Sequence, residues 1–442
     1  MSDSHKNWSW IPTLYIAEGF PYAVITALSL VMFKTLPHGM SDAAIIFWTS
    51  LLGLPWVLKP FWAPCIDLFG KKRNWILLCQ VAMGAAFLAT AAAVPFSSAA
   101  PCLILLFLFT AFASATHDAA ADGFYIIALT PHEQAFFSGI RNTFYRLALL
   151  AAQGVLLSLV FTLTKRWSAS AQWTAFFVMA GGILCILAAA HVLFLPHVET
   201  VSVQLSGIRE TAVSFLESFQ MFFRKKRIVR ALLFLLFYRF AEAQLTKASA
   251  LFLLETREQG GLALNTAQYA NIYGTAGMLA LLAGGILGGI FVARFGLGRM
   301  LLLMALAINL PDIVYVYLAF ARPEQLSIIA SCVGFEQFGY GFGFTAYTMF
   351  MLFFAEDSGK FRTTHYAFMT GIMALSLMLP GMVSGAILDN MQSILGPLAP
   401  LCERYELFFL WVMICTIPAL LTVPLVKGFL PTDFGRTPEK KT

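Results

Sequence analysis

The sequence predicts an all-α integral membrane protein with about twelve transmembrane helices, arranged as two parallel six-helix halves. Composition is the first reason: 59% of the 442 residues are hydrophobic and 12% are charged, whereas a soluble domain carries about 25% charged residues. The second is that apolar segments fill the chain and leave no room for a separate soluble domain. The third is a single long polar interruption near the middle.

The apolar segments have the length that a membrane helix requires. A helix needs about 20 mostly apolar residues to cross the hydrocarbon core. The first segment contains Glu18 and follows a short polar start without a small-residue cleavage site, so we expect a retained helix and not a signal peptide. The predicted spans are 11–33, 43–65, 74–96, 101–125, 138–163, 173–195, 229–254, 268–293, 299–320, 326–354, 363–388 and 405–427.

The basic residues predict the orientation of the spans. Lys and Arg are enriched in cytoplasmic loops of membrane proteins. With a cytoplasmic N-terminus, most of the 29 Lys and Arg residues fall on the inner side, and both termini lie in the cytoplasm. The net charge of +6 then reflects topology, and no nucleic-acid partner is needed to explain it. The few outer basic residues are Lys34, Lys165, Arg166, Arg257, Arg322 and Arg404.

The polar interruption divides the chain into three parts. Residues 1–196 form an N-terminal six-helix half, 197–228 a cytoplasmic linker, and 229–442 a C-terminal six-helix half. The linker stretch "GIRETAVSFLESFQMFFRKKR" has helical periodicity and a basic end, which predicts an amphipathic helix. The turns "PCIDLFGKKR" and "GGIFVARFGLGR" echo each other in the two halves. A parallel six-plus-six repeat is the architecture of major facilitator transporters.

The first of these turns is a candidate gate. A glycine permits the tight turn, an aspartate can accept hydrogen bonds from a helix N-terminus, and the basic run can bind anionic headgroups. Such a turn can hold one state of a rocking transporter closed, and the alternative is a simple positive-inside anchor. The residues of this gating turn are Asp67, Gly70, Lys71, Lys72 and Arg73.

Charged residues inside the predicted spans are the strongest functional signal. Each charge costs about 2.5–3.5 kcal/mol at the bilayer centre, so most must face water or one another. Carboxylates fall on the first, fourth, seventh and tenth spans, which line the central cavity of a six-plus-six facilitator. The charged residues within spans are Glu18, Lys59, Asp118, Asp122, Arg141, Arg146, Arg239, Glu242, Lys247, Asp312 and Glu336.

Pairing is the alternative to a functional role for some of these charges. Asp118 and Asp122 are four residues apart and share a helix face, and the following hairpin brings Arg141 and Arg146 within reach. Those four form either a helix–helix clamp or part of the cavity.

Three glutamates lie nearer the middle of the membrane. Glu18, Glu242 and Glu336 are candidate proton carriers. Arg239 precedes Glu242 by three residues, so these two can simply pair. His117 is either a packed histidine or a proton relay.

No sequence motif indicates an enzyme, a cofactor or a metal site. The chain has no P-loop, HExxH or GxSxG motif, so ATP is not expected to drive it. The seven cysteines have no ligand spacing and are interpreted as small hydrophobic residues. Protons are the expected coupling ion, and a small-molecule substrate and the lipid bilayer are the expected partners of a monomer.

Several motifs together resemble AmpG-type muropeptide permeases of the major facilitator superfamily. The resemblance covers nearly the whole chain. Its specific part is the helix 4 signature, with Asp118 followed by a second aspartate four residues later, and it extends to Arg146 and Glu336. The matching stretches are "KPFWAPCIDLFGKKRNWILL", "SATHDAAADGFYIIALTPHEQ", "YRLA", "LLFYRFAEA", "GFEQFGYGFG" and "TTHYAFMTGI".

The resemblance implies proton-driven import of anhydro-muropeptides across a bacterial inner membrane for cell-wall recycling. These substrates are N-acetylglucosaminyl-anhydro-N-acetylmuramyl peptides, and Arg141, Arg146 or Arg239 would bind their carboxylates. Relatives with similar signatures move acetyl-CoA or iron-siderophores, which remain the alternative. A channel or membrane sensor is the other class to consider, and it leaves the six-plus-six repeat unexplained.

Overall fold

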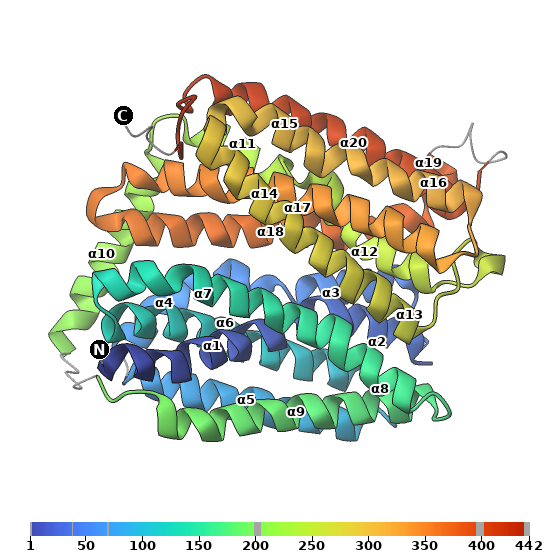
Figure 1. Ribbon diagram of the computed structural model, residues 1–442, viewed down its shortest axis with the longest axis horizontal. Coiled ribbons are helices and arrows are strands. Elements are labelled where there is room, and N and C mark those ends of the chain that lie inside the picture. Colours follow the sequence, from blue (N-terminus) through green and yellow to red (C-terminus); the bar gives the residue numbers. More distant parts are fainter. Residues whose placement is uncertain (1, 38, 69, 199–204, 395–401, 437–442) are drawn as a thin grey trace. The chain divides into compact units, whose positions relative to one another are not determined.

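The computed structural model describes residues 2–37, 39–68, 70–198, 205–394 and 402–436 (Figure 1). Within those residues the secondary structure is helical throughout, without strands. Contacts between residues divide the chain into two compact units. Unit 1 comprises Met1–Met40 and Leu52–Leu216, and unit 2 comprises Ser41–Leu51 and Glu217–Thr442.

Unit 1 is a helical bundle in which α5 and α9 run side by side (Figure 1). Their close approach depends on two glycines, because a Cβ on Gly84 would lie 2.8 Å from the Cys185 Sγ and one on Gly181 would lie 2.9 Å from the Gly84 carbonyl oxygen. The helices are α1 (Ser2–Ala23), α2 (Ser29–Thr35), α4 (Leu54–Leu68), α5 (Lys72–Ala93), α6 (Ala100–Ala128), α7 (Pro131–Leu150), α8 (Leu157–Leu163) and α9 (Ala169–Phe194). The predicted linker contains α10 (Leu205–Phe223), which ends in unit 2.

Unit 2 is built around the long helix α17, which packs against α14 and α15. Glycines again form the contact: a Cβ on Gly341 would lie 2.1 Å from the Leu281 carbonyl oxygen. The helices are α3 (Asp42–Leu51), α11 (Ile228–Phe237), α12 (Phe240–Leu254), α13 (Thr266–Tyr269), α14 (Met278–Phe295), α15 (Leu297–Asn309), α16 (Ile313–Ala321), α17 (Leu326–Glu356), α18 (Arg362–Asp389), α19 (Met391–Ile394) and α20 (Arg404–Lys427).

Eleven helical segments in the described residues are long and apolar enough to cross a membrane. They correspond to eleven of the twelve spans that the sequence predicts. The remaining span, 229–254, forms α11 and α12 with a break at Tyr238 and Arg239. The all-α membrane fold is therefore confirmed, and one predicted helix is discontinuous.

Several other spans are interrupted at defined points. Single π-helical segments, η1 (Val24–Leu28), η2 (Ala151–Leu156) and η4 (Ala270–Gly277), lie within continuous helical spans. The 3₁₀ turn η5 (Leu310–Asp312) separates α15 from α16 and contains Pro311, which lacks the N–H that a continuous helix needs. π-Bulges often mark functional sites, so these interruptions identify positions to examine.

Helix α3 belongs to unit 2, although the chain on both sides of it belongs to unit 1. It packs against α18 at two glycines. A Cβ on Gly385 would lie 2.7 Å from the Cα of Ala43, and one on Gly381 would lie 2.9 Å from the Ser50 Oγ. Backbone contact of this kind is how membrane helices associate in the absence of a hydrophobic driving force.

We expect Gly284→Ala to lower the thermal unfolding midpoint of the detergent-purified protein by several degrees. The new Cβ would lie 2.0 Å from the Phe338 carbonyl oxygen, so α14 and α17 must separate. Overpacking of this kind costs about 1–3 kcal/mol. The matched control is Gly289→Ala on the same helix, where a Cβ meets nothing within 4 Å. Equal unfolding midpoints for the two variants would show that Gly284 is not needed for the close contact between α14 and α17.

Candidate functional site

Three carboxylates of unit 1 form a cluster in which Glu18 is buried and the two aspartates are partly exposed. Glu18 lies on α1, and Asp118 and Asp122 lie one turn apart on α6. One carboxylate oxygen from each lies within 4.8 Å of the others. The four-residue spacing puts the two aspartates on one face of α6, as the sequence predicts. The structure therefore brings together three of the predicted site residues.

Two bases accompany this cluster. The Lys59 ammonium on α4 contacts Asp118, with Nζ 2.6 Å from Oδ2, and the Arg141 guanidinium on α7 contacts Asp122, with Nη2 3.0 Å from Oδ1. Asp118 therefore pairs with Lys59, whose role as its partner the sequence analysis had not identified. Arg146 lies on α7 and is partly buried.

Aromatic rings hold the Arg141 side chain in place. Its guanidinium carbon lies 4.9 Å from the centre of the Tyr15 ring and 5.2 Å from that of Tyr125. The Tyr15 hydroxyl also donates to Asp122 Oδ1 at 3.4 Å. Arg141 remains 29% exposed and Asp122 remains 41% exposed. A cation that is fixed in orientation but open to solvent can bind an anionic ligand.

His117 lies in a different environment from its neighbour Asp118. Its ring is fully buried and lies 2.9 Å from the Gln80 amide nitrogen, measured from Nε2. The Gln80 amide oxygen is in turn 2.9 Å from Nδ1 of His191, whose Nε2 is 2.9 Å from the Thr13 hydroxyl. This chain of hydrogen bonds joins α6, α5, α9 and α1, which fits the interpretation of His117 as a packed, hydrogen-bonded histidine.

Unit 2 contains a second cluster of three carboxylates. Glu242 lies on α12, Asp312 on the turn η5 and Glu336 on α17, and each is at most 2% exposed. One oxygen from each lies within 4.8 Å of the others. Both glutamates are among the site residues predicted from the sequence, whereas Asp312 is predicted there only as a charge within a span. Its position next to Pro311 was the signal that could have identified it, because a helix break in a membrane span is a common ion site.

Arg239 does not form the ion pair with Glu242 that the sequence analysis considered. Its guanidinium donates instead to the Tyr340 hydroxyl and lies 4.7 Å from the centre of the Phe344 ring. Glu242 accepts a 2.8 Å hydrogen bond from Thr246 through Oε1, while Oε2 has no partner among the described residues. The break between α11 and α12 turns Arg239 toward the aromatic side chains of α17.

The predicted gating turn has a structural role in unit 1. Gly70 has φ +89°, a left-handed conformation that glycine adopts readily. Arg73 donates to the carbonyl oxygens of Val192 and Leu195, at 2.7 and 3.2 Å, and so caps the C-terminal end of α9. Lys71 precedes α5 and Lys72 begins it. The side chain of Asp67 lies outside the part of the chain that the structure describes.

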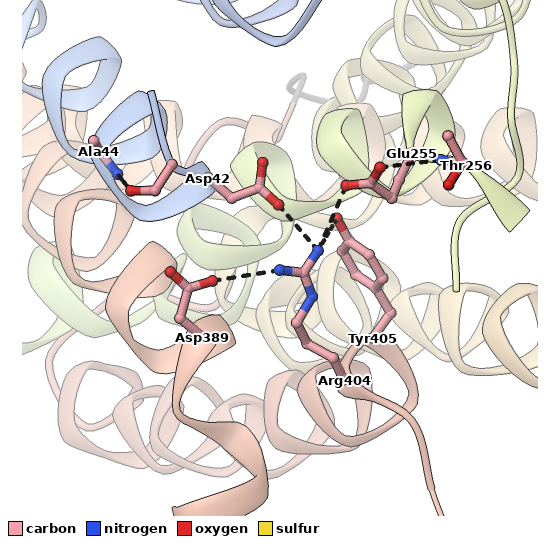
Figure 2. Close-up of polar contacts among 8 residues, drawn as sticks. Asp42, Ala44, Glu255, Thr256, Asp389, Arg404 and Tyr405 are labelled. Carbon is pink, nitrogen blue, oxygen red and sulfur yellow. Dashed lines mark hydrogen bonds and ion pairs between the residues drawn. The ribbon is translucent and has the colours of Figure 1, made fainter. Parts of the chain in front are cut away.

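An ion-pair cluster fixes α3 to the rest of unit 2. Figure 2 shows three carboxylates from separate elements pointing toward the Arg404 guanidinium. Its Nη2 lies 3.0 Å from Asp42 Oδ2 and 3.5 Å from Glu255 Oε2, and its Nη1 lies 3.4 Å from Asp389 Oδ1. Asp42 begins α3, so one arginine at the start of α20 joins α3 to the ends of α12 and α18.

Known proteins similar to this chain are membrane transporters. The family model of the Major Facilitator Superfamily matches residues 13–385. The anhydromuropeptide permease of Escherichia coli K12 is 24% identical over 92% of this chain and 77% of its own length, and a Rickettsia conorii protein designated AmpG 4 is 24% identical over 92% and 93%. A crystal structure of a D-xylose-proton symporter, 12% identical, superposes with a TM-score of 0.72 over 98% of this chain and 99% of its own.

A double-mutant cycle tests the ion pair between Lys59 and Asp118. We expect Lys59→Met to lower the unfolding midpoint strongly, because it leaves Asp118 as an unpaired, largely buried carboxylate. Breaking a buried pair costs about 3–5 kcal/mol, and the loss here should be at the low end because both side chains are 16% exposed. Asp118→Asn in the same chain should restore most of the loss. Additive effects of the two substitutions would show that the pair does not interact.

We expect Arg404→Gln to free α3 from unit 2. A charge-assisted contact contributes about 1.5–3 kcal/mol, so the buried Ser50→Cys thiol should react roughly tenfold faster with a maleimide when the arginine is lost. The measurement uses a background without the seven native cysteines. Arg322→Gln is the matched control, because Arg322 contacts Glu403 and Glu406 and not α3. Equal labelling rates in the two backgrounds would rule out this role for Arg404.

Proposed function

This chain belongs to the Major Facilitator Superfamily, and from that premise we propose that it imports anhydromuropeptides across a bacterial inner membrane in symport with protons. That it is a multi-pass secondary transporter follows from the family and the fold. The substrate is inferred from a relative named anhydromuropeptide permease. The orientation with both termini in the cytoplasm rests on the distribution of basic residues.

The observation that best supports proton coupling is the charge balance of the unit 1 cluster. Three carboxylates, those of Glu18, Asp118 and Asp122, face two bases, Lys59 and Arg141. When all five are ionised, one negative charge is in excess. Glu18 Oε2 is buried and has no hydrogen-bond partner, so a proton there would remove an unfavourable charge. The cluster is therefore suited to taking up and releasing one proton.

The same cluster can link proton binding to substrate binding. Transfer of this proton from Glu18 to Asp118, within the same cluster, would neutralise the partner of Lys59 and leave its ammonium free to bind a substrate carboxylate. Arg141, still partly exposed, can hold a second anionic group with its planar guanidinium. Loss of the proton on the other side of the membrane would restore the ion pair between Lys59 and Asp118 and release the substrate. In this scheme, a pH gradient drives accumulation.

Aromatic side chains near Glu18 suit a sugar-containing substrate. The rings of Tyr22 and Trp56 meet edge to face with their centres 4.9 Å apart, and the Tyr145 ring lies 6.2 Å from that of Tyr22. Rings with a polar edge can pack against a sugar while hydrogen-bonding its hydroxyl groups. Amphipathic anionic solutes of other kinds share some of this chemistry, so the substrate must be tested directly.

Uptake into proteoliposomes tests the proposal. We expect saturable accumulation of labelled anhydromuropeptide when the outside is more acidic than the lumen, and none when a protonophore removes the gradient. Labelled acetyl-CoA and an iron-siderophore are the comparison substrates. Accumulation of either of these without muropeptide uptake would contradict the proposed substrate. Muropeptide uptake that ignores the protonophore would contradict proton coupling.

Asp118→Asn should lower gradient-driven uptake at least tenfold, about 1.4 kcal/mol or more in the transport step. The amide cannot release a proton and cannot pair with Lys59 as a carboxylate does. The variant should still reach the membrane, because asparagine keeps the size and a polar side chain. The control is Thr116→Ala on the same helix, where the exposed hydroxyl donates only to the Phe112 carbonyl oxygen. Near-normal uptake by Asp118→Asn would reduce this residue to helix packing.

A further inference from the structure

The carboxylate cluster of unit 2 lacks the bases that balance the cluster of unit 1. No Lys, Arg or His among the described residues forms an ion pair with Glu242, Asp312 or Glu336. Arg239, the base nearest in sequence, is occupied by Tyr340 and Phe344. Three negative charges enclosed in a membrane domain are far more costly than one, so something positive must accompany them.

The Asp312 carboxylate is the most exceptional of the three. It is 1% exposed, and neither Oδ1 nor Oδ2 has a hydrogen-bond partner among the described residues. A buried carboxylate normally accepts several hydrogen bonds. Its position follows from Pro311, which breaks the helix between α15 and α16 and holds Asp312 in the turn η5. Both carboxylate oxygens of Asp312 are buried and accept no hydrogen bond, which points to a ligand that supplies positive charge.

Hydrogen-bond donors orient both glutamates. Gln337 donates its amide nitrogen to both oxygens of Glu336, at 3.2 and 3.0 Å, and Thr246 donates to Glu242 Oε1. Glu242 Oε2 is buried without a partner. Hydrogen bonds of this kind fix the orientation of a carboxylate. The unsatisfied Oε2 of Glu242 thus belongs to a carboxylate whose orientation is fixed.

A neutral oxygen follows Asp312 on the next helical turn. Tyr315 follows Asp312 by three residues on the same helical segment, which puts both side chains on one face. Its hydroxyl is fully buried and has no partner of normal hydrogen-bond geometry, although Ser249 interacts with it. Carboxylate and hydroxyl oxygens together are ligands for a hard cation.

We propose that Glu242, Asp312 and Glu336 form a binding site for one small, hard metal cation of the Na⁺ or Ca²⁺ class. Oxygens that bind a common cation at about 2.3–2.6 Å lie at most twice that distance apart. The three carboxylate oxygens meet this condition, being within 4.8 Å of one another. One cation at their centre would contact one oxygen of each carboxylate, including an otherwise unpartnered oxygen of Asp312. This site is separate from the carboxylates of unit 1 and does not depend on the identity of the substrate.

Helix discontinuities surround the proposed site on three sides. Glu242 lies one turn after the break between α11 and α12, Asp312 lies within η5, and Tyr273, whose hydroxyl contacts the Gln337 amide at 3.4 Å, lies in the π-helical segment η4. Secondary transporters commonly place coupling-ion sites at such interruptions, because backbone and side-chain groups are released from the regular helix there. The helix interruptions therefore support an ion site at this position independently of the charges of its residues.

Cation-dependent thermal stability of the purified, full-length protein tests the proposal. The protein is prepared in a choline buffer at mildly alkaline pH and titrated separately with NaCl, CaCl₂ and, for ionic strength, choline chloride. A ligand that binds only the folded state stabilises it in proportion to the logarithm of its concentration above Kd. We expect the unfolding midpoint to rise by several degrees with NaCl or CaCl₂, in proportion to the logarithm of the concentration above Kd, and not to rise with choline chloride. Equilibrium binding of ²²Na⁺ or ⁴⁵Ca²⁺ gives the stoichiometry, expected to be one ion per chain.

Variants assign the response to this cluster. Asp312→Asn and Glu336→Gln should each lower the apparent cation affinity at least tenfold, and both remove uncompensated charge, so folded protein is expected. Glu18→Gln, in the unit 1 cluster, is the matched control and should respond as the parent does. No response to either metal would overturn the proposal and leave a cluster that holds only protons. A response that persists in Asp312→Asn and Glu336→Gln would also overturn it, because the ion would bind elsewhere.

The result can be separated from that of the transport experiment, because cation binding is measured without any substrate. Metal binding with no muropeptide uptake would reject the proposed substrate and keep the site. Muropeptide uptake by a protein that binds no metal would support the proposed substrate and reject the cation site.

Discussion

Compensation of buried charge is the constraint on which the rest of this structure depends. Water is absent from the hydrocarbon core, so each ionised side chain must find an opposite charge, a strong donor or an ion. Unit 1 meets the requirement with Lys59 and Arg141, which contact the two aspartates of α6. In unit 2, Glu242, Asp312 and Glu336 form no ion pair with a Lys, Arg or His of the described residues. The different solutions imply different roles: paired acids can exchange partners, whereas unpaired acids need a ligand.

The backbone is adapted to place these charges. A regular membrane helix satisfies its own hydrogen bonds and presents side chains at fixed angles, which limits how many polar groups can converge. In unit 2 the helices break at Arg239 and Pro311, which removes that limit. Glycines such as Gly284 and Gly341 let the backbones of α14 and α17 come into contact. Helix breaks let polar side chains come together, and glycines let helices pack closely. Both are local departures from a regular helix with large side chains.

The sequence predicted the fold because hydropathy and loop charge report directly on membrane spans. It also placed Asp118 and Asp122 on one helix face, since a helical period relates them and family resemblance singles out their helix, but it grouped Glu18 with Glu242 and Glu336 and not with these aspartates. Other features depended on distances between spans, which periodicity does not encode. Lys59 was therefore not recognised as the partner of Asp118, and Asp312 was not grouped with Glu242 and Glu336. The break at Tyr238 and Arg239 was also missed, because neither residue is a glycine or proline that would announce it.

The assignment of α3 to unit 2 has a consequence for biosynthesis. This helix is made early, yet the surface of α18 that receives it, with Gly381 and Gly385, and its anchor Arg404 come from the last part of the chain. At about 5–20 residues per second, α3 waits on the order of tens of seconds for these partners. During that interval a short helix with an acidic first residue must persist in the bilayer without its final neighbours. Assembly of this protein thus ends with the docking of α3 onto a helix that is far from it in the sequence. The C-terminal part expressed as a separate fragment would expose the surface of α18 at Gly381 and Gly385 that α3 normally covers.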